Sequence, residues 1–142
     1  MHNSALEIVA FILGEEEYGM EIAKVQEIIR VPEKTTKLPN TAEYFLGVTN
    51  LRDDVIPVID LKHKFMNIRT EYTEETRVVV IEVSAKKIGL IVDEVVEVMK
   101  IPADMIMMTE TINASINVDY LLGIARLNER LLILLNGDTI LN

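Results

Sequence analysis

The sequence predicts a mainly all-β protein built from two similar five-stranded barrels packed together, with short helical segments. The first observation behind this prediction is that runs of five to eight residues rich in Val, Ile and Thr are bounded by turn-forming residues. Such β-branched side chains suit a pleated, half-buried strand. The second observation is that the chain repeats itself. The third is that five strands per copy can curl one sheet into a small barrel, which leaves no exposed edge.

The repeat consists of two blocks of sequence that recur in the same order. Residues 15–32 align with residues 85–102 at a constant offset of 70, and residues 44–61 align with residues 120–137 at an offset of 76. The change of offset is a six-residue insertion in the second copy, which we expect in a loop. Identical residues at aligned positions are Gly19 and Gly89, Val25 and Val95, Glu27 and Glu97, Pro32 and Pro102, Tyr44 and Tyr120, Leu46 and Leu122, Gly47 and Gly123, and Leu51 and Leu127. We therefore expect two copies of one fold.

Each copy is expected to contain five short strands. In the first copy they lie near 6–13, 17–22, 25–31, 45–52 and 55–60, and in the second near 76–83, 86–92, 95–101, 121–127 and 131–135. A helix is expected from Leu61 to Asn67, followed by a polar linker. Short helical turns around Ile22 remain open, because the apolar residues there also fit a helical stripe. The expected organisation is one domain in which residues 6–61 form the first barrel, 62–75 connect, and 76–137 form the second.

The overall composition excludes several classes of protein. The chain has 142 residues and no cysteine, which excludes thiolate catalysis, disulfides and cysteine-ligated zinc. Its formal net charge of -9 would repel phosphate backbones, so nucleic acid is not an expected partner. No apolar run approaches the roughly 20 residues that cross a bilayer, and residues 1–10 do not resemble a signal peptide. We expect a cytoplasmic protein without membrane insertion.

The side chains that carry catalysis do not form a recognisable constellation. His2 and His63 have no metal-ligand spacing, and the serines, including Ser4, lack a nucleophile-elbow context. Asn113-Ala114-Ser115 matches a glycosylation acceptor by its letters alone. We expect no enzymatic activity, cofactor or metal. A small ligand- or cation-binding β-barrel that uses acidic turns such as Asp53-Asp54 remains the alternative.

Two long segments carry a family resemblance. They are LGEEEYGMEIAKVQEIIRVP at residues 13–32 and FLGVTNLRDDVIPVIDL at residues 45–61. Both closely resemble the CheW family of bacterial chemotaxis coupling proteins, and the resemblance covers residues 6–141. It implies two SH3-like barrels that bridge chemoreceptor cytoplasmic tips to the regulatory domain of the histidine kinase CheA, without a reaction of their own.

The same resemblance implies a protein that is monomeric when free and is recruited to membrane-associated receptor arrays. The kinase regulatory domain and CheV-type couplers share these motifs, but no receiver or kinase sequence follows here, so we expect a stand-alone coupler. An adaptor of another chemosensory pathway, such as surface motility, remains a further alternative.

The family's functional residues can be transferred to matching positions of this sequence. Those implied to face the receptor are Val25, Glu27, Gly47, Arg52, Gly89 and Val95, and those implied to face the kinase are Leu13, Tyr18 and Ile28. Structural alternatives stay open for most of them. The two valines and all three kinase-facing residues fit barrel packing, and the glycine at 47 fits a close approach of two chain segments.

Arg52 is the sharpest of these predictions, because the second copy has Asn128 at its position. A purely structural requirement would favour the same residue in both copies. Asp53 stands where the family has glycine, and aspartate tolerates a positive φ, although its carboxylate is also placed to pair with Arg52. Pro57 lacks a backbone donor, so its strand is expected at a sheet edge or a bulge.

Overall fold

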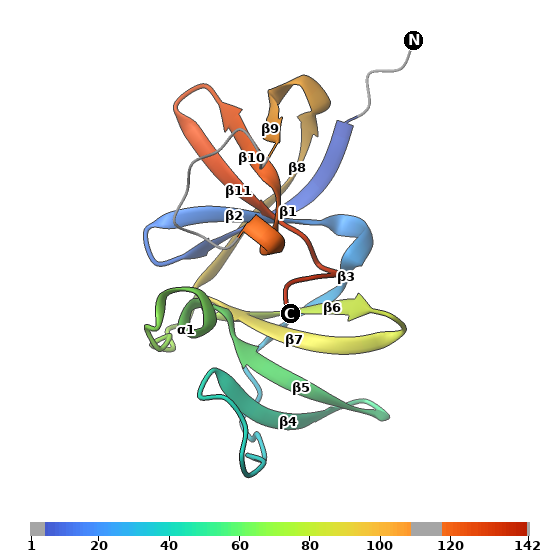
Figure 1. Ribbon diagram of the computed structural model, residues 1–142. Helices are drawn as coiled ribbons and strands as arrows, with labels where there is room; N and C mark the ends of the chain where they lie inside the picture. Colours follow the sequence, from blue (N-terminus) through green and yellow to red (C-terminus); the bar gives the residue numbers. More distant parts are fainter. Residues whose placement is uncertain (1–4, 109–117, 142) are drawn as a thin grey trace.

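The computed structural model describes residues 5–108 and 118–141 (Figure 1). His2, Ser4 and Asn113-Ala114-Ser115, which the sequence analysis considered, lie outside the described residues. The described strands form two sheets, which we call barrel A and barrel B. Barrel A contains β1 (Ala5–Leu13), β2 (Glu16–Glu21), β8 (Glu94–Pro102), β9 (Ile106–Met108), β10 (Leu121–Leu127) and β11 (Arg130–Leu135). Barrel B contains β3 (Val25–Arg30), β4 (Phe45–Leu51), β5 (Asp54–Asp60), β6 (Arg77–Val83) and β7 (Lys86–Val92).

The ten strands expected from the sequence are all present, so the all-β, two-barrel fold class is confirmed. One additional strand, β9, was not expected, because three residues are too few for a recognisable pattern. It pairs with β10, and barrel B has a single bridge between Thr36 and Val48 at the corresponding place. The short turn at Ile22–Lys24 is a 3-10 helix, and further 3-10 turns lie at Ala103–Met105 and Val118–Tyr120.

The strands of each barrel come from both halves of the chain. The order in barrel A is β8-β1-β2-β11-β10-β9, and in barrel B it is β3-β6-β7-β5-β4. The expected division into barrels at 6–61 and 76–137 therefore differs from the observed pairing, because β1 and β2 join the later strands and β6 and β7 join the earlier ones. The repeat specifies each local hairpin, whereas the sheet that a hairpin joins depends on long-range contacts. The chain crosses between barrels at residues 22–24 and at Asp93.

Three apolar clusters hold the molecule together. One lies inside barrel A around Ile8 and Leu134, and a second lies inside barrel B around Val80 and Ile91. The third and largest lies between the barrels and takes residues from both. The largest cluster contains Phe11, Leu13, Tyr18, Met20, Ile59, Leu61, Val79, Ile81, Ile88, Leu90, Val92, Leu121, Ile133, Leu135 and Ile140. Because the third cluster excludes water between the barrels, we expect them to unfold as one unit.

Aromatic rings continue this shared core toward the surface. Phe11 stacks on Tyr18, and Tyr18 contacts Phe65, each with 6.2 Å between ring centroids. Phe65 in turn stacks on Tyr120 at 5.5 Å. Burial raises the pKa of Tyr18 to about 12, with a smaller contribution from the nearby carboxylate of Glu16, so this phenol stays neutral in the folded protein.

Helix α1 (Leu61–Met66) contacts both barrels at one side of the molecule (Figure 1). Its bounds are close to those of the expected helix, residues 61–67. The Asp60 carboxylate caps its start by accepting from the backbone N–H of His63 at 3.2 Å, and Asn67 ends it with a φ of 58°. The ammonium of Lys64 lies 4.7 Å from the ring centroid of Tyr44 and 4.8 Å from that of Tyr120. One lysine therefore makes cation–π contacts to two tyrosines, which occupy equivalent positions in the two copies.

Pro57 lies next to a register irregularity, which is one of the two places that the prediction allowed, because β4 shifts its register between Phe45 and Gly47, opposite Ile59 and Val58. Its strand, β5, lies between β7 and β4 rather than at a sheet edge. Val48, which faces Pro57 on β4, exchanges its backbone hydrogen bonds with Thr36 at 2.8 and 2.9 Å, and pairing with β7 begins only at Val58. The donor that proline lacks is therefore not needed there.

Candidate interaction surface

The structure brings two predicted receptor-facing residues together on barrel B. Glu27 lies on β3 and Arg52 lies in the turn between β4 and β5, and their side chains form an ion pair. The hydrogen bond from Arg52 to Glu27 raises the pKa of Arg52 above its ordinary value. The Arg52 side chain remains 69% exposed, whereas that of Glu27 is 24% exposed. The pair therefore presents a guanidinium that is oriented by one carboxylate and still open to solvent.

The turn that carries Arg52 differs from the expectation in one respect. The positive φ falls on Arg52 itself, at 56°, and not on Asp53. Asn128, at the same position of barrel A, also has a φ of 56°, so the turn backbone is shared by both copies. Asp53 therefore need not adopt a left-handed backbone, and the observed partner of Arg52 is Glu27.

Barrel A contains a related ion pair that the sequence comparison did not reveal. Arg130 bonds Glu17 through two nitrogens, at 2.8 and 2.6 Å, and bonds Glu97 at 2.9 Å. Glu97 is the repeat equivalent of Glu27. The second copy thus also has a glutamate–arginine pair. Its arginine, however, lies two residues after Asn128, the position that aligns with Arg52. The absence of arginine at 128 is therefore no evidence by itself that Arg52 is functional.

Exposure distinguishes the two arginines more clearly than the alignment does. The Arg130 side chain is 35% exposed and is held by two carboxylates, whereas Arg52 is held by one. Bidentate binding and partial burial make Arg130 a structural contact. Arg52 has more guanidinium surface available for an external acidic group.

Val25 and Val95 lie just beyond the two crossings between the barrels. Each is half-buried and packs against the cluster that the barrels share. Val25 pairs with Ile81 on β6, and Val95 pairs with Phe11 on β1. Both valines therefore contribute to packing while keeping part of their surface exposed.

The two predicted glycines are buried and are explained by close approach. A Cβ on Gly47, whose φ is 138°, would lie 2.4 Å from the carbonyl oxygen of Thr36. At the equivalent Gly123, a Cβ would lie 2.5 Å from the oxygen of Met107. A Cβ on Gly89 would lie 2.8 Å from a methyl carbon of Val78. These glycines therefore shape the barrels and offer no side chain to a partner.

The three predicted kinase-facing residues separate into two groups. Leu13 and Tyr18 are 0% and 2% exposed and belong to the core between the barrels. The structure corrects their assignment, because neither side chain is exposed to a partner. The sequence did not reveal this burial, because an apolar strand pattern does not show which face of the strand is covered. Ile28 is 39% exposed on β3, so it alone of the three presents an apolar surface.

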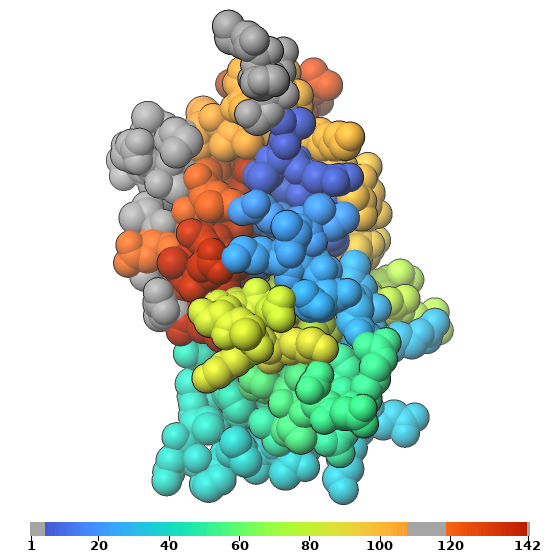
Figure 2. Space-filling model, turned by 90° about the vertical axis from the view of Figure 1, so that its right-hand side faces the viewer, coloured from blue at the N-terminus to red at the C-terminus, as the bar shows by residue number. Residues whose placement is uncertain are grey.

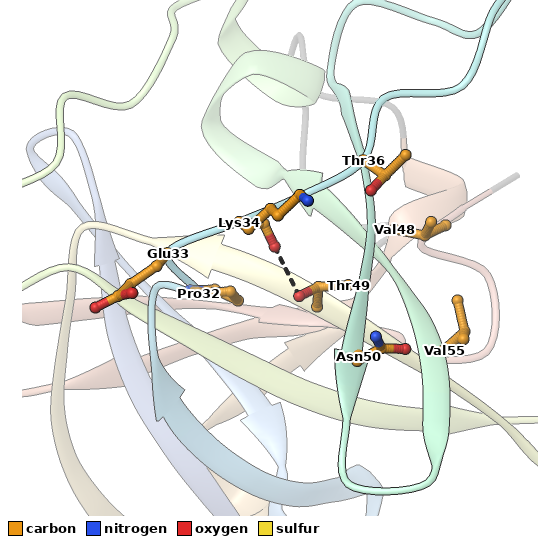
Figure 3. A pocket seen from close by; sticks show the side chains of 8 residues that line it. All are labelled: Pro32, Glu33, Lys34, Thr36, Val48, Thr49, Asn50 and Val55. Carbon is orange, nitrogen blue, oxygen red and sulfur yellow. Dashed lines mark hydrogen bonds between the residues drawn. The ribbon is translucent and has the colours of Figure 1, made fainter.

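An open groove lies beside the Arg52 turn and was missed by the sequence analysis (Figure 3). Its volume is about 630 Å³, and its lining residues are Pro32, Glu33, Lys34, Thr36, Val48, Thr49, Asn50 and Val55. The Thr49 hydroxyl donates to the Lys34 carbonyl at 2.9 Å and holds the two walls together. Asn50 and Val55 flank the turn, so the groove extends the surface that Arg52 begins.

The surface has few of the features of a cation or catalytic site. Within residues 5–108 and 118–141, no group of three or more His, Cys, Asp or Glu side chains is placed to hold a metal ion. Asp54, from the acidic turn that suggested the alternative function, bonds Lys87 at 3.0 Å. In the same part of the chain, no helix has the length and apolarity that crossing a membrane requires. The described residues thus form two barrels around a common core, with ion-paired and apolar groups on their open surfaces.

Comparison with known proteins places this chain in a family. The CheW-like domain family matches residues 7–142. The chain is 38% identical over 136 residues to the chemotaxis protein CheW of Klebsiella aerogenes, which covers 96% of this chain and 81% of that protein. It is 32% identical over 151 residues to the chemotaxis protein CheV3 of Helicobacter pylori, covering 98% of this chain but 48% of that protein.

A solved structure agrees with this assignment. The scaffolding protein TtCheW of Thermoanaerobacter tengcongensis superposes with a TM-score of 0.87 at 33% identity, covering 99% of this chain and 90% of that one. The chain belongs to the CheW family.

Proposed function

We propose that this protein is a non-catalytic adaptor that couples chemoreceptor cytoplasmic tips to the regulatory domain of the histidine kinase CheA. Membership of the CheW family supports a role in chemotaxis, and the solved relative is described as a scaffolding protein. The single observation that carries the proposal is the exposed guanidinium of Arg52, oriented by Glu27 at the edge of an open groove. The protein works in the cytoplasm and is recruited to receptor arrays through its partners.

The receptor-facing surface consists of Val25, Glu27 and Arg52 on barrel B and Val95 on barrel A. The valines supply the half-buried apolar part, and the ion pair supplies the charged part. A partner carboxylate that approaches Arg52 would share the guanidinium with Glu27, which already holds it in place. Such a preorganised arginine is a typical anchor of a protein interface.

The kinase-facing surface includes Ile28 on β3, which is exposed. Its repeat equivalent, Val98 on β8, is also exposed, at 51%. An apolar side chain at this position of each barrel provides a contact for a partner of similar architecture. We expect affinities near the micromolar range, about -8 kcal/mol, which suit a protein whose contacts are reinforced by multivalent assembly.

The Arg52→Glu variant tests the receptor-facing surface. We expect the affinity for a receptor-tip fragment to fall at least about tenfold, because the variant removes a cation and places two carboxylates side by side. Binding to the kinase regulatory domain and the melting temperature should stay close to the wild-type values, because Arg52 is exposed. Isothermal titration calorimetry with each partner and a thermal melt measure these three quantities.

Arg126→Glu is the matched control, because Arg126 is exposed on barrel A and the variant has the same change of charge. It should bind the receptor fragment like the wild type. Equal loss in both variants would assign the effect to net charge. A melting temperature lowered by several degrees in Arg52→Glu would identify Arg52 as a structural residue and contradict the proposed surface.

A further inference from the structure

The turn between β4 and β5 carries one charge that no other group in the described part of the chain neutralises. Arg52 and Asp53 are the two residues between these strands, so they form the tip of the hairpin. Arg52 pairs with Glu27, and Asp54, the next residue along the chain, pairs with Lys87 at 3.0 Å. The carboxylate of Asp53 is exposed and takes part in no hydrogen bond or ion pair among the described residues.

A second pair of adjacent opposite charges lies across the open groove from this turn (Figure 3). Glu33 and Lys34 line one wall of the groove, whereas Asn50 and Val55, which flank the turn, line the other. The side chains of Glu33 and Lys34 are exposed, and neither forms an ion pair within residues 5–108 and 118–141. The hydrogen bond from the Thr49 hydroxyl to the Lys34 carbonyl connects the walls, so the two charged segments are held in one arrangement.

An exposed aliphatic side chain accompanies these charges. Figure 2 shows this side of the molecule, where the green β4–β5 segment lies at the surface beside the yellow-green β6–β7 segment. Val55, the second residue of β5, is 65% exposed. Covering such a side chain contributes to binding, because its contact with water is unfavourable. We call Glu27, Glu33, Lys34, Arg52, Asp53 and Val55 the turn surface.

The equivalent turn of barrel A has a different charge pattern. Asn128 and Glu129 stand at the positions of Arg52 and Asp53. Glu129 is exposed, but the arginine next to it, Arg130, is already held by two carboxylates. This turn also points to the opposite side of the molecule (Figure 1). Of the two turns, the one in barrel B alone places a free carboxylate beside an open guanidinium.

A partner that binds Arg52 also meets Asp53. The two residues are adjacent and both are exposed at the tip of the hairpin, so a partner carboxylate that approaches the guanidinium approaches the Asp53 carboxylate as well. Like charges that face each other across an interface weaken binding. A carboxylate that loses its water without gaining a hydrogen-bond donor weakens it further. A basic group on the partner, placed against Asp53, removes both costs.

A partner with charges of one sign gains little from the turn surface. The surface holds two cations, Arg52 and Lys34, and three carboxylates, Glu27, Glu33 and Asp53. A purely basic site is repelled by the two cations, and a purely acidic site is repelled by the carboxylates. Such a mixed pattern discriminates between partners more than it attracts any of them, because each charge excludes the wrong sign.

We propose that Asp53 is a specificity-determining residue, and that the receptor tip bound by this protein carries a basic side chain beside the acidic one that meets Arg52. This inference rests on the proposed function, since it takes Arg52 to face the receptor. The basic group of the receptor pairs with Asp53, its acidic group shares the guanidinium of Arg52 with Glu27, and an apolar group covers Val55. A receptor tip that offers acidic groups alone binds more weakly, because Asp53 repels it.

The Asp53→Lys variant tests this inference through the sign of its effect. We expect its affinity for a receptor-tip fragment to fall at least about tenfold, because the new ammonium group faces the basic side chain of the receptor. If the receptor site were acidic alone, the variant would bind more tightly than the wild type, because it would gain a second cation. Asp53→Asn, which removes the charge and keeps the shape, should bind about threefold more weakly than the wild type. Isothermal titration calorimetry at low salt measures these affinities.

Glu129→Lys is the matched control, because it makes the same change of charge at the equivalent turn of barrel A. That turn points away from the turn surface, so the control should bind the fragment like the wild type. About 0.5 M NaCl should reduce the difference between Asp53→Lys and the wild type, because salt screens exposed charges. All three variants should melt close to the wild-type temperature, since both carboxylates are exposed and unpaired among the described residues.

Charge reversal on the receptor fragment locates the group that meets Asp53. Each basic residue of the fragment is changed to glutamate, one at a time, and every product is titrated with the wild type and with Asp53→Lys. One of these fragments should bind the wild type more weakly than the unaltered fragment does. The same fragment should bind Asp53→Lys at least about tenfold more tightly than the unaltered fragment does, because opposite charges then face each other again.

Two results would overturn the role of Asp53 and leave the proposed function in place. One is an Asp53→Lys variant that binds the fragment as tightly as the wild type or more tightly, while Arg52→Glu binds it weakly. The other is the failure of every charge-reversed fragment to restore the binding of Asp53→Lys. A wild-type protein that does not bind the fragment at all would instead overturn the proposed function, and the role of Asp53 with it.

Discussion

The Gly47→Ala variant is expected to lose at least about 3 kcal/mol of unfolding free energy. Two effects combine at this position. The backbone φ of 138° is strained for any residue with a Cβ, and the new methyl group would lie 2.4 Å from the carbonyl oxygen of Thr36. That carbonyl cannot move away freely, because it accepts the backbone hydrogen bond of Val48 at 2.9 Å. Urea unfolding followed by circular dichroism measures the loss.

Gly14→Ala is the matched control for this variant. Gly14 also has a positive φ, 67°, but a Cβ there would have no neighbour closer than 3.8 Å. Its cost should stay at about 1–2 kcal/mol, the cost of a left-handed alanine, which is well below the cost at Gly47. If Gly47→Ala were as stable as the wild type and lost receptor binding alone, the packing explanation would be wrong and Gly47 would be a contact residue.

The Asp60→Ala variant is expected to lose about 3 kcal/mol of unfolding free energy. The Asp60 carboxylate is 2% exposed and accepts three hydrogen bonds. It caps α1 at His63, and it binds the backbone N–H of Thr70 at 2.8 Å and the Thr70 hydroxyl at 2.7 Å. Alanine leaves these buried donors without their acceptor, so α1 and the segment around Thr70 should loosen together. Thermal unfolding and amide hydrogen exchange of residues 61–70 report the two effects.

Asp138→Ala provides the comparison, because Asp138 is 58% exposed and forms a surface ion pair with Lys24. Surface ion pairs contribute little to stability, so this variant should unfold close to the wild type. Asp60→Ala with an unchanged melting temperature and unchanged exchange at residues 61–70 would show that the three hydrogen bonds do not stabilise the connection.

Local structure could be predicted from the sequence because its signals are local. β-branched runs indicated the ten expected strands, and the short helix was expected at the bridge between the two copies. The pairing of β1 and β2 with the strands of the second copy could not be predicted in this way. Both copies have the same hairpin pattern, so exchanging hairpins between barrels changes no local preference. Contacts between distant segments, including the cluster around Tyr18, decide the exchange.

The candidate site could be predicted only in part. Glu27 and Arg52 were singled out from the sequence, and the structure pairs them. Leu13 and Tyr18 were assigned to a partner surface, although they lie in the core that forms when the barrels meet. Arg130 was missed, because it reaches Glu97 from a position that the alignment does not equate with Arg52. Such contacts depend on how far a side chain reaches across a turn. The alignment of the two copies gives no information about this reach.

The proposed bridging of a receptor to the kinase can be measured directly. The direct measurement uses an immobilised chemoreceptor cytoplasmic fragment and a solution of the CheA regulatory domain, with and without this protein. We expect the regulatory domain to be retained only when the protein is present, and we expect Arg52→Glu to reduce the retention while Arg126→Glu does not. A protein that binds neither partner at high micromolar concentration, or that releases one partner when it binds the other, would rule out a bridging role.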